Sequence, residues 1–392
     1  MKEESLECRV SPQRLRVFAK RQKRIIRRVT IGGTFQARKR DKAKENMMKK
    51  LLLVMFTAVT VLLAASSWNT AEALLIGEAI EAIGDQLVSA QGPSGGWPGE
   101  AGFTGSIVAG LANAYEITGK AAYSTAAQLG GDYIISTAGG NFYGDEAYAL
   151  ARLTDITGDT SYANAARNFY DSLNTIPYIA AFTATERSNA VFYVAEHAVA
   201  ANMVGAADAG LWRAGLILYL SQIADDEAFY PVQSLGVATW ALAKSGPMDG
   251  TEIDPFDIGE AYWSDVTLAD LPALLLSHQV ASGAYEGSFY VRYDHDAPGV
   301  GFEASGYTED TVFGTLGLIA SGGSADDILA ARMALALGVN SAGDVYEHIW
   351  SGGASYYVYG GEVLQAIPEP ASLLLLGTGT LMLLRRKRKK SA

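Results

Sequence analysis

An internal repeat constrains the fold of this chain more than any other feature of its sequence. Residues 116–127 (EITGKAAYSTAA) align without gaps on residues 155–166 (DITGDTSYANAA), at an offset of 39 residues. Upstream, Phe103 falls on Phe142 and Gly105 on Gly144. Each unit predicts one helix that ends at an Ile-Thr-Gly turn and a second helix that begins near the tyrosine. Because a single hairpin cannot bury its own apolar face, the repeat predicts a stack of helical hairpins.

Two looser copies of the unit follow at residues 234–246 and 308–322, and both are typical of a small-residue helix that stops at Ser-Gly. The chain has 392 residues and is 49% hydrophobic, which is enough for one large core or two smaller ones. We therefore predict an all-α body over residues 74–366.

Two loops between helical units share a pattern. A glutamine is followed four residues later by glycine and two residues after that by an aromatic side chain, as Gln91, Gly95 and Trp97 and again as Gln279, Gly283 and Tyr285. We expect the glutamine to cap a helix end, the glycine to make a tight turn and the aromatic ring to cover that turn.

With these motifs the body resembles the α/α-toroid of the terpenoid cyclase and protein prenyltransferase superfamily, in which Gln-Trp motifs lie between helical hairpins. The resemblance implies a ring of hairpins, but the chemistry of the superfamily does not follow. The acidic motif of triterpene cyclases is Asp-x-Asp-Asp, and residues 294–297 (DHDA) lack its last aspartate. Prenyltransferases bind zinc through a cysteine, and Cys8, outside the body, is the only cysteine of the chain. A degenerate terpenoid-cyclase-like protein is the second alternative for the function.

The N-terminal region divides into two parts ahead of the body. Residues 1–46 are rich in lysine and arginine without a sustained apolar period, and we interpret them as an upstream start artefact or a basic disordered segment. Residues 47–73 have the form of a signal peptide: the basic MMKK, an apolar stretch over residues 51–65 and a small-x-small cleavage site at residues 71–73. This segment predicts export through the Sec translocon and cleavage by signal peptidase.

The C-terminal region, residues 367–392, carries Pro368, Glu369 and Pro370, then an apolar run over residues 371–384 and six consecutive cations. As a helix the 14-residue run is about 21 Å long, short of the ~30 Å hydrocarbon core of a bilayer. The cations resist translocation, so we expect a short membrane helix with its basic end in the cytoplasm and the body outside.

This order of triad, apolar run and basic tail resembles the PEP-CTERM sorting signal. The resemblance implies an exosortase-type processing enzyme as partner and inner-membrane anchoring before processing. It also implies a final place at the cell surface or in the extracellular matrix. Such signals often occur in bacteria that make extracellular polysaccharide, so exopolysaccharide is a candidate partner.

The charge of the body is strongly asymmetric with respect to its flanks. Residues 74–366 hold eight lysines and arginines against 35 aspartates and glutamates, a net charge of −27. Such a surface repels nucleic acid and polyanionic glycans and attracts cations, and its simplest role is solubility. Nucleic acid is thus excluded as a partner.

The densest mixture of aromatic, carboxylate and histidine side chains begins at Tyr285 and continues to Glu309 and Asp310. In sugar-processing α/α barrels, aromatic rings stack on sugar faces while carboxylates perform acid-base work. For a glycan-active enzyme the catalytic candidates are Arg292, Asp294, His295 and Asp296. The alternative interpretation is an acidic loop between hairpins with packed aromatic rings.

Two further clusters are weaker candidates. The loop with Asp249, Glu252, Asp254 and Asp257 has the carboxylates for a calcium ion without the spacing of an EF-hand, and a solvated loop is the alternative. The adjacent Glu196 and His197 are expected to form a surface or inter-helix pair, with an acid-base pair as the alternative.

These patterns leave two main functional hypotheses. The first is an exported, envelope-targeted protein with a binding or structural role, and its rival is a secreted polysaccharide hydrolase or lyase. The most useful single observation is whether carboxylates and aromatic rings converge at one mouth of the ring.

Overall fold

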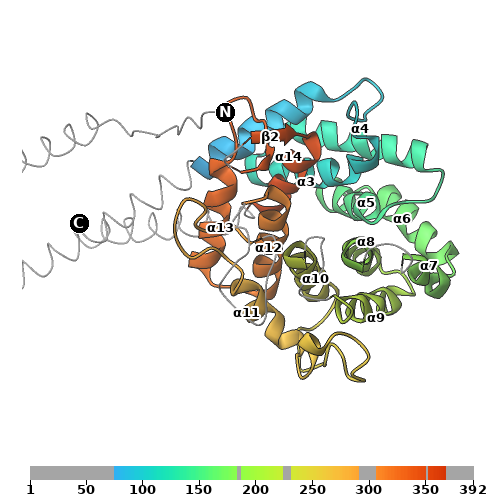
Figure 1. Cartoon of the computed structure of the whole chain (residues 1–392). Coiled ribbons are helices and arrows are strands. Elements are labelled where there is room, and N and C mark those ends of the chain that lie inside the picture. The colour runs from blue at the N-terminus through green and yellow to red at the C-terminus, as the bar shows by residue number, and fades with distance from the viewer. Residues whose placement is uncertain (1–74, 183–186, 224–230, 291–305, 350–351, 368–392) are drawn as a thin grey trace, which may run out of the picture. The chain divides into compact units, whose positions relative to one another are not determined.

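Consecutive helices of this chain form hairpins whose first member faces a common centre. The computed structural model describes residues 75–182, 187–223, 231–290, 306–349 and 352–367. Within them, six helices form an inner ring: α3 (Thr104–Thr118), α5 (Gly144–Thr157), α8 (Arg187–Val204), α10 (Pro231–Ser245), α12 (Thr308–Ser321) and α14 (Tyr357–Ala366). Each packs against the next, and α14 closes the ring by packing against α3 (Figure 1).

A second layer of helices covers the ring from outside. It consists of a helix over residues 75–90 together with α4 (Ala121–Ala138), α6 (Thr160–Ser172), α7 (Thr175–Ala181), α9 (Ala209–Leu220), α11 (Leu271–Leu276) and α13 (Ala325–Leu337). The pairs α3 with α4, α5 with α6, α8 with α9 and α12 with α13 are hairpins. The predicted all-α toroid is therefore confirmed.

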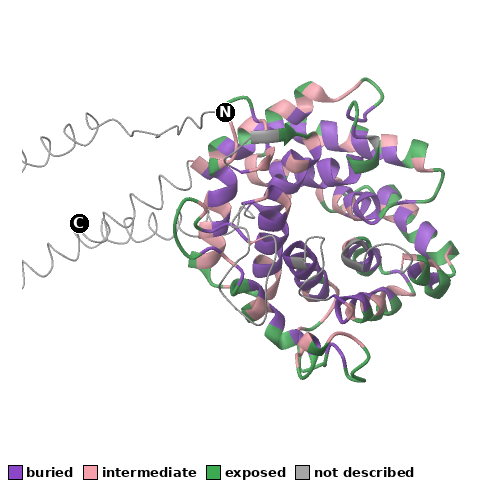
Figure 2. Cartoon of the chain, viewed as in Figure 1, coloured by how far each residue is buried: buried purple, intermediate pink, exposed green. Residues whose placement is uncertain are grey.

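The inner and outer helices differ in composition because they differ in burial. Every residue of α3 from Thr104 to Ala114 is buried, and small or apolar side chains therefore predominate on all sides of this helix. In α6 the buried residues are only Tyr162, Ala166, Phe169 and Tyr170, which lie on one face. Figure 2 shows the buried residues concentrated in the inner ring.

Glycines end the repeated inner helices as the repeat predicts. Gly119 after α3 and Gly158 after α5 have left-handed φ values of 69° and 73°, and their N–H groups donate to Tyr115 and Thr154. Gly322 after α12 has φ 80°. These left-handed residues turn the chain back to form the outer helix.

Glycines also let the inner helices touch backbone to backbone. A Cβ at Gly110 of α3 would lie 2.2 Å from the carbonyl oxygen of Gly361 in α14. A Cβ at Gly105 would lie 2.4 Å from the backbone of α5, and one at Gly236 of α10 would lie 2.6 Å from the backbone of α12. These contacts bring the ring to a diameter that larger residues would not permit.

The two glutamine loops join the layers. The Gln91 side chain donates to the carbonyls of Gly95 and Ala126, each at 2.8 Å, and so ties its loop to α4. Gln279 donates to the carbonyls of Gly287 at 3.0 Å and Asp327 at 2.9 Å. Both glutamines thus bind a neighbouring outer helix.

The glycine of the second loop that matches Gly95 is Gly287 rather than the expected Gly283. A Cβ at Gly95 or at Gly287 would lie 2.2 Å from a carbonyl of the neighbouring outer helix. The second loop is four residues longer between the glutamine and this glycine, so the two loops do not align at the spacing that the sequence pattern suggested. Its buried aromatic ring is accordingly Phe289, while Trp97 of the first loop donates to the Leu87 carbonyl at 2.8 Å and Tyr285 is only half-buried.

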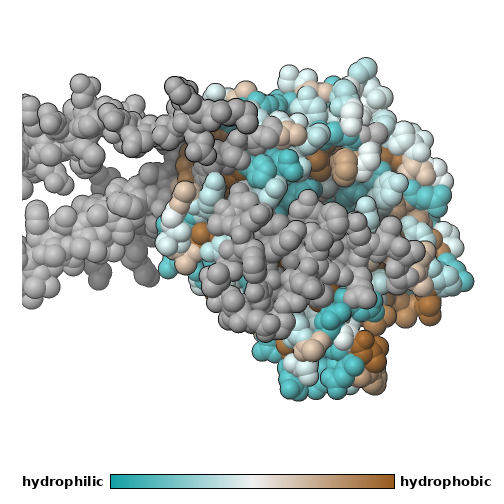
Figure 3. Space-filling view, in the orientation of Figure 1, coloured by the Kyte–Doolittle hydropathy of each residue, from teal (hydrophilic) through white to brown (hydrophobic). Residues whose placement is uncertain are grey.

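Short irregular elements connect the hairpins. A two-stranded antiparallel sheet, which the sequence patterns did not indicate, pairs β1 (Tyr346–His348) with β2 (Gly352–Ser355) ahead of α14. The 3₁₀ helices are η1 (Ala101–Phe103), η3 (Ala261–Trp263) and η4 (Leu268–Asp270). On the surface, the described apolar and polar residues alternate in patches (Figure 3).

The expected signal peptide and the apolar run of the C-terminal tag both lie outside the described residues. Among the helices that are described, none combines the length and the hydropathy that a membrane span needs.

We predict that Gly110→Ala destabilises the protein, because the new methyl group would overlap the Gly361 carbonyl. The free energy of unfolding should fall by about 1–3 kcal/mol, the range for an overpacked core. Gly77→Ala is the matched control: no atom lies within 4 Å of a Cβ there. In a helix this change should leave stability unchanged or raise it by up to about 1 kcal/mol. Urea unfolding followed by circular dichroism measures both, and equal stability of the two variants would contradict the prediction.

Candidate functional site

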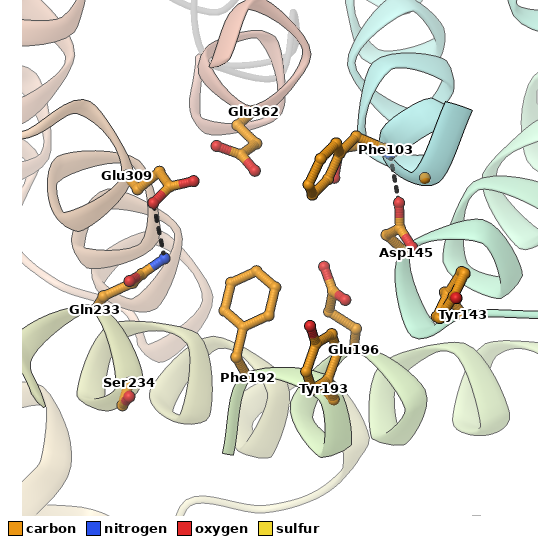
Figure 4. Close-up of a pocket in the computed structure, with 12 residues that line it drawn as sticks. Phe103, Tyr143, Asp145, Phe192, Tyr193, Glu196, Gln233, Ser234, Glu309 and Glu362 are labelled. Atoms are coloured by element: carbon orange, nitrogen blue, oxygen red, sulfur yellow. Dashed lines mark hydrogen bonds between the residues drawn. The ribbon is translucent and has the colours of Figure 1, made fainter. Parts of the chain in front are cut away.

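A cavity of about 400 Å³ lies at the mouth of the ring where the inner helices begin. Its lining comes from the first turns of α3, α5, α10 and α12, from the first half of α8 and from α14: Gly102, Phe103, Ser106, Tyr143, Asp145, Phe192, Tyr193, Glu196, Gln233, Ser234, Glu309 and Glu362. Figure 4 shows Glu196, Glu309, Glu362 and Phe192 directed toward the same space. Carboxylates and aromatic rings thus converge at one mouth.

The direction of the inner helices explains why acids gather here. The N-terminal end of a helix carries a partial positive charge and unpaired N–H groups, both of which favour carboxylates. Asp145 and Glu146 occupy the first turn of α5, and Glu309 and Asp310 occupy the first turn of α12. Glu100 lies at the N-terminal end of α14, where its two carboxylate oxygens accept hydrogen bonds from the N–H groups of Tyr357 and Val358, each at 2.6 Å.

Asp145 and Glu196 line the cavity from the neighbouring helices α5 and α8. Gly144, which precedes Asp145, allows α5 to approach α8 closely, since a Cβ there would lie 2.6 Å from the Cβ of Glu196. Burial raises the pKa of Asp145 to about 6, although the Ser106 N–H donates to its Oδ2 at 3.1 Å and opposes the shift. Burial, reinforced by the charge of Asp145, raises the pKa of Glu196 well above its ordinary value. Asp145 therefore ionises before Glu196.

Glu362 contributes an oxygen with no partner. Its side chain is 4% exposed, and its Oε2 accepts no hydrogen bond within the described part of the chain. Burial raises its pKa well above the ordinary value, and the charges of Glu309, Glu196, Asp145 and Glu100 add to this shift. An acceptor left in this state is costly, so a donor from a ligand would stabilise it.

Glu309 lies on the same wall of the cavity as Gln233. The Gln233 side chain donates to Glu309 Oε2 at 3.4 Å. Burial, with the nearby charge of Glu347, raises the pKa of Glu309 to about 7. Glu309 is therefore part protonated near neutral pH.

Exposed aromatic rings surround the carboxylates. Phe103 is 54% exposed, Tyr143 60% and Tyr193 43%, and all three line the cavity. The Tyr193 ring is held by stacking on Phe182, and Phe192 packs edge-on against Phe313 with ring centroids 4.9 Å apart. Rings that are fixed in place yet open to solvent offer flat apolar surface to a ligand.

The residues expected to be catalytic from sequence, Arg292, Asp294, His295 and Asp296, lie outside the described residues. Of the expected acidic continuation, Glu309 does line the cavity and Asp310 is buried beside it.

Two carboxylates of the expected calcium loop form hydrogen bonds within the loop itself. Asp249 accepts the N–H and hydroxyl of Thr251, and Asp254 accepts the N–H groups of Ile258 and Gly259. These carboxylates shape their own loop, with Glu252 and Asp257 exposed. In the ranges that the structure describes, no group of three histidine, cysteine or carboxylate side chains is arranged to hold a metal ion, and this includes the cavity.

The adjacent Glu196 and His197 separate into different environments. Glu196 faces the cavity, whereas His197 is buried among aromatic rings and its Nδ1 lies 3.0 Å from the Tyr170 hydroxyl. Burial lowers the pKa of His197 to about 3, so the ring stays neutral. An acid-base pair of these two residues is therefore excluded.

Sequence reasoning missed Asp145 and Glu362, although a signal for Asp145 was present. The repeat at offset 39 aligns Asp145 with Ser106, so an acid stands in one copy where the other has serine. The signal is weak, because acids are favoured in the first turn of any helix, and it marks only a position where the two copies differ in charge. Glu362 has no such signal, because it lies within a short glycine-rich helix.

Ring and cavity define the body as an α/α-toroid with an acidic, aromatic-lined mouth. Residues 366–389 match the family model of the PEP-CTERM protein-sorting motif. The chain therefore carries a PEP-CTERM sorting signal and is an exported protein sorted by an exosortase-type system. The motif begins at Ala366, the last residue of α14, which is fully buried.

None of the curated proteins matches the sequence. Two solved structures resemble the fold: the GH76A alpha-1,6-mannanase of Salegentibacter sp. HEL1_6, and an inactive variant of it in complex with alpha-1,6-mannotriose. Each is 13% identical, with a TM-score of 0.49, and the match covers 76% of this chain and 99% of that chain. No residue role follows from a likeness at this level.

The raised pKa values predict that the protein loses stability as pH rises from about 5 to about 8. Glu309 keeps its proton up to a pKa of about 7 in the folded state but loses it near 4.5 when unfolded, and Asp145 behaves likewise between 3.8 and about 6. The folded state binds more protons across this range, so the free energy of unfolding must fall with pH. With about 1.4 kcal/mol for each unit of pKa difference, we expect a loss of at least about 2 kcal/mol.

Urea unfolding at pH 5, 6, 7 and 8 measures this loss. Glu362→Gln removes one of the buried acids, so its stability should fall less steeply than that of the unaltered protein. A stability that rises across the range would contradict the assignment of these acids as desolvated.

Proposed function

We propose that the protein is an exported glycoside hydrolase whose active site is the cavity at the N-terminal mouth of the ring. The observation that carries the proposal is the convergence of carboxylates from α5, α8, α12 and α14 with exposed aromatic rings in one cavity. This combination distinguishes a glycan-cleaving site from a purely structural body, in which buried acids without partners would only reduce stability.

The unequal pKa values of Asp145 and Glu196 support a division of roles. Glu196, which holds its proton to higher pH, donates it to the glycosidic oxygen as the bond to the leaving sugar breaks. Asp145, ionised near neutral pH, stabilises the positive charge at the anomeric carbon or takes the proton of the attacking water. The Ser106 N–H fixes the orientation of the Asp145 carboxylate.

The aromatic rings support binding of a chain rather than of a single sugar. Phe103, Tyr143 and Tyr193 belong to three different elements around the cavity, so they offer separate surfaces to successive sugar rings. Export places this site among extracellular polysaccharides, the substrate class that the proposal names. A binding role without catalysis is the second candidate, favoured by the sorting signal.

We expect Asp145→Asn and Glu196→Gln each to lower kcat by about 10²–10⁴-fold, the usual range for loss of a general acid or base. Release of reducing ends from a panel of neutral and charged polysaccharides by the purified protein measures this effect. Asp155→Asn is the matched control: it lies on the same helix α5 but lines a different cavity. If the unaltered protein binds glycans but cleaves none, the binding role replaces the hydrolase.

We expect Phe103→Ala to raise KM by about tenfold with a smaller change in kcat, because the ring offers binding surface without touching the bond that breaks. Phe256→Ala is the control, since Phe256 is 78% exposed and does not line the cavity. Steady-state kinetics on the best substrate of the panel gives both constants. An equal effect of the two substitutions would exclude a binding surface at Phe103.

A further inference from the structure

The charges of the described residues are separated along the axis of the ring. The cavity at the N-terminal mouth is lined by Asp145, Glu196, Glu309 and Glu362, and its described lining contains no lysine or arginine. A second cavity of about 240 Å³ lies where the inner helices end, and its lining includes Arg152, Lys244 and Arg332. This second lining also holds Asp155, which forms an ion pair with Arg152 at 3.2 Å, so it carries both signs of charge, whereas the charged residues in the described lining of the first cavity are all acids.

Within the described chain, the acids that line the N-terminal cavity have no counter-charge. Asp145 and Glu309 each accept a hydrogen bond, from the Ser106 N–H and the Gln233 amide, but these donors are uncharged. No salt bridge within the described chain involves the four lining acids. Without a counter-charge, burial favours the protonated forms of these acids, and a cation among them would favour their ionised forms and attract the carboxylates that result.

Glu362 provides this cluster with a buried hydrogen-bond acceptor that faces the cavity. It is 4% exposed, it faces the cavity, and its Oε2 has no hydrogen-bond partner within the described residues. Figure 4 shows its carboxylate directed into the open space between Glu309 and Phe103. A ligand group that both donates hydrogen bonds and carries positive charge satisfies this oxygen best.

A bare metal ion is not that group, because the described carboxylates are not clustered closely enough to coordinate one. An ammonium group carried on a larger molecule fits better, since its three N–H donors reach separate acceptors. The exposed rings of Phe103 and Tyr143 beside the acids supply surface for the body of such a molecule and attract cations through their faces.

We propose that the cavity selects a cationic glycan, a polymer of amino sugars with free primary amines, over the same polymer with acetylated amines and over polyuronates. This inference rests on the proposed function, which supplies the glycan, and it adds the charge of the substrate. One sugar ring stacks on the aromatic rim while its ammonium group lies against Glu362 and Glu309. A uronate in that place would add a further negative charge to the buried acids.

The test compares three oligosaccharides of equal length by isothermal titration calorimetry on the purified protein: hexamers of glucosamine, of N-acetylglucosamine and of galacturonate. At 0.15 M salt the glucosamine hexamer should bind at least about tenfold more tightly than the acetylated one, and the galacturonate hexamer should not bind measurably. The preference should survive 0.5 M salt, because salt screens the exposed charges of the body far more than a buried pair.

Glu362→Gln keeps the size of the side chain and removes its ability to ionise beside an ammonium group, so it should reduce the ratio between the two hexosamine oligomers by about tenfold. Glu252→Gln, which removes an exposed acid of a distant loop, is the control for general attraction to the acidic body and should leave the ratio unchanged. Equal reductions by the two substitutions would overturn the proposal.

The comparison of hexamers in the unaltered protein does not depend on any variant folding. If the acetylated hexamer binds as well as the amine form, the charge preference is wrong while the proposed hydrolase stands. If no oligosaccharide of any charge binds, the glycan site itself is overturned.

Discussion

Backbone contact between inner helices at glycine is the constraint on which the rest of this structure depends. Gly110 meets Gly361 where the ring closes, Gly105 meets the start of α5, and Gly236 meets α12. With side chains at these points the helices would separate, and the ring would widen by up to about 2 Å at each interface. The small cavity at the mouth exists because the ring is this narrow: acids from four helices can face one space of about 400 Å³ only if the helices nearly touch.

The same geometry makes the site costly to maintain. Helix N-termini favour carboxylates locally, yet the convergence of several such ends removes those carboxylates from water and places them beside one another. Desolvation is the largest cause of the raised pKa at Asp145, Glu196, Glu309 and Glu362. The charges of other acids in this set add to it at Glu196 and Glu362, and the charge of Glu347 adds to it at Glu309. A protein that keeps acids in this arrangement loses stability for it, as is usual where chemistry or binding requires perturbed groups.

The sorting signal and the cavity divide the chain between two tasks. The PEP-CTERM protein-sorting motif begins at the buried end of α14, so its first residue still belongs to the last helix of the ring. Ala366 and Ile367, the last described residues of the chain, are buried, and Ile367 lines the cavity where the inner helices end, at the opposite end of the ring from the acidic mouth.

The all-α class, the hairpin repeat, the glycine turns and the C-terminal tag could be predicted from sequence, because each depends on residues close together in the chain. The site could not. Asp145, Glu196, Glu309 and Glu362 are separated by 217 residues between first and last, and nothing in their local sequence states that four helix faces meet. For the same reason the side chains of Glu196 and His197 lie in different environments although the two residues are adjacent in the chain. The glycine that matches Gly95 in the second loop is likewise Gly287 and not Gly283. Local propensity determined which segments are helices and where they turn; only ring closure, set by backbone contacts between distant glycines, decided which side chains share a cavity and how far from water they lie.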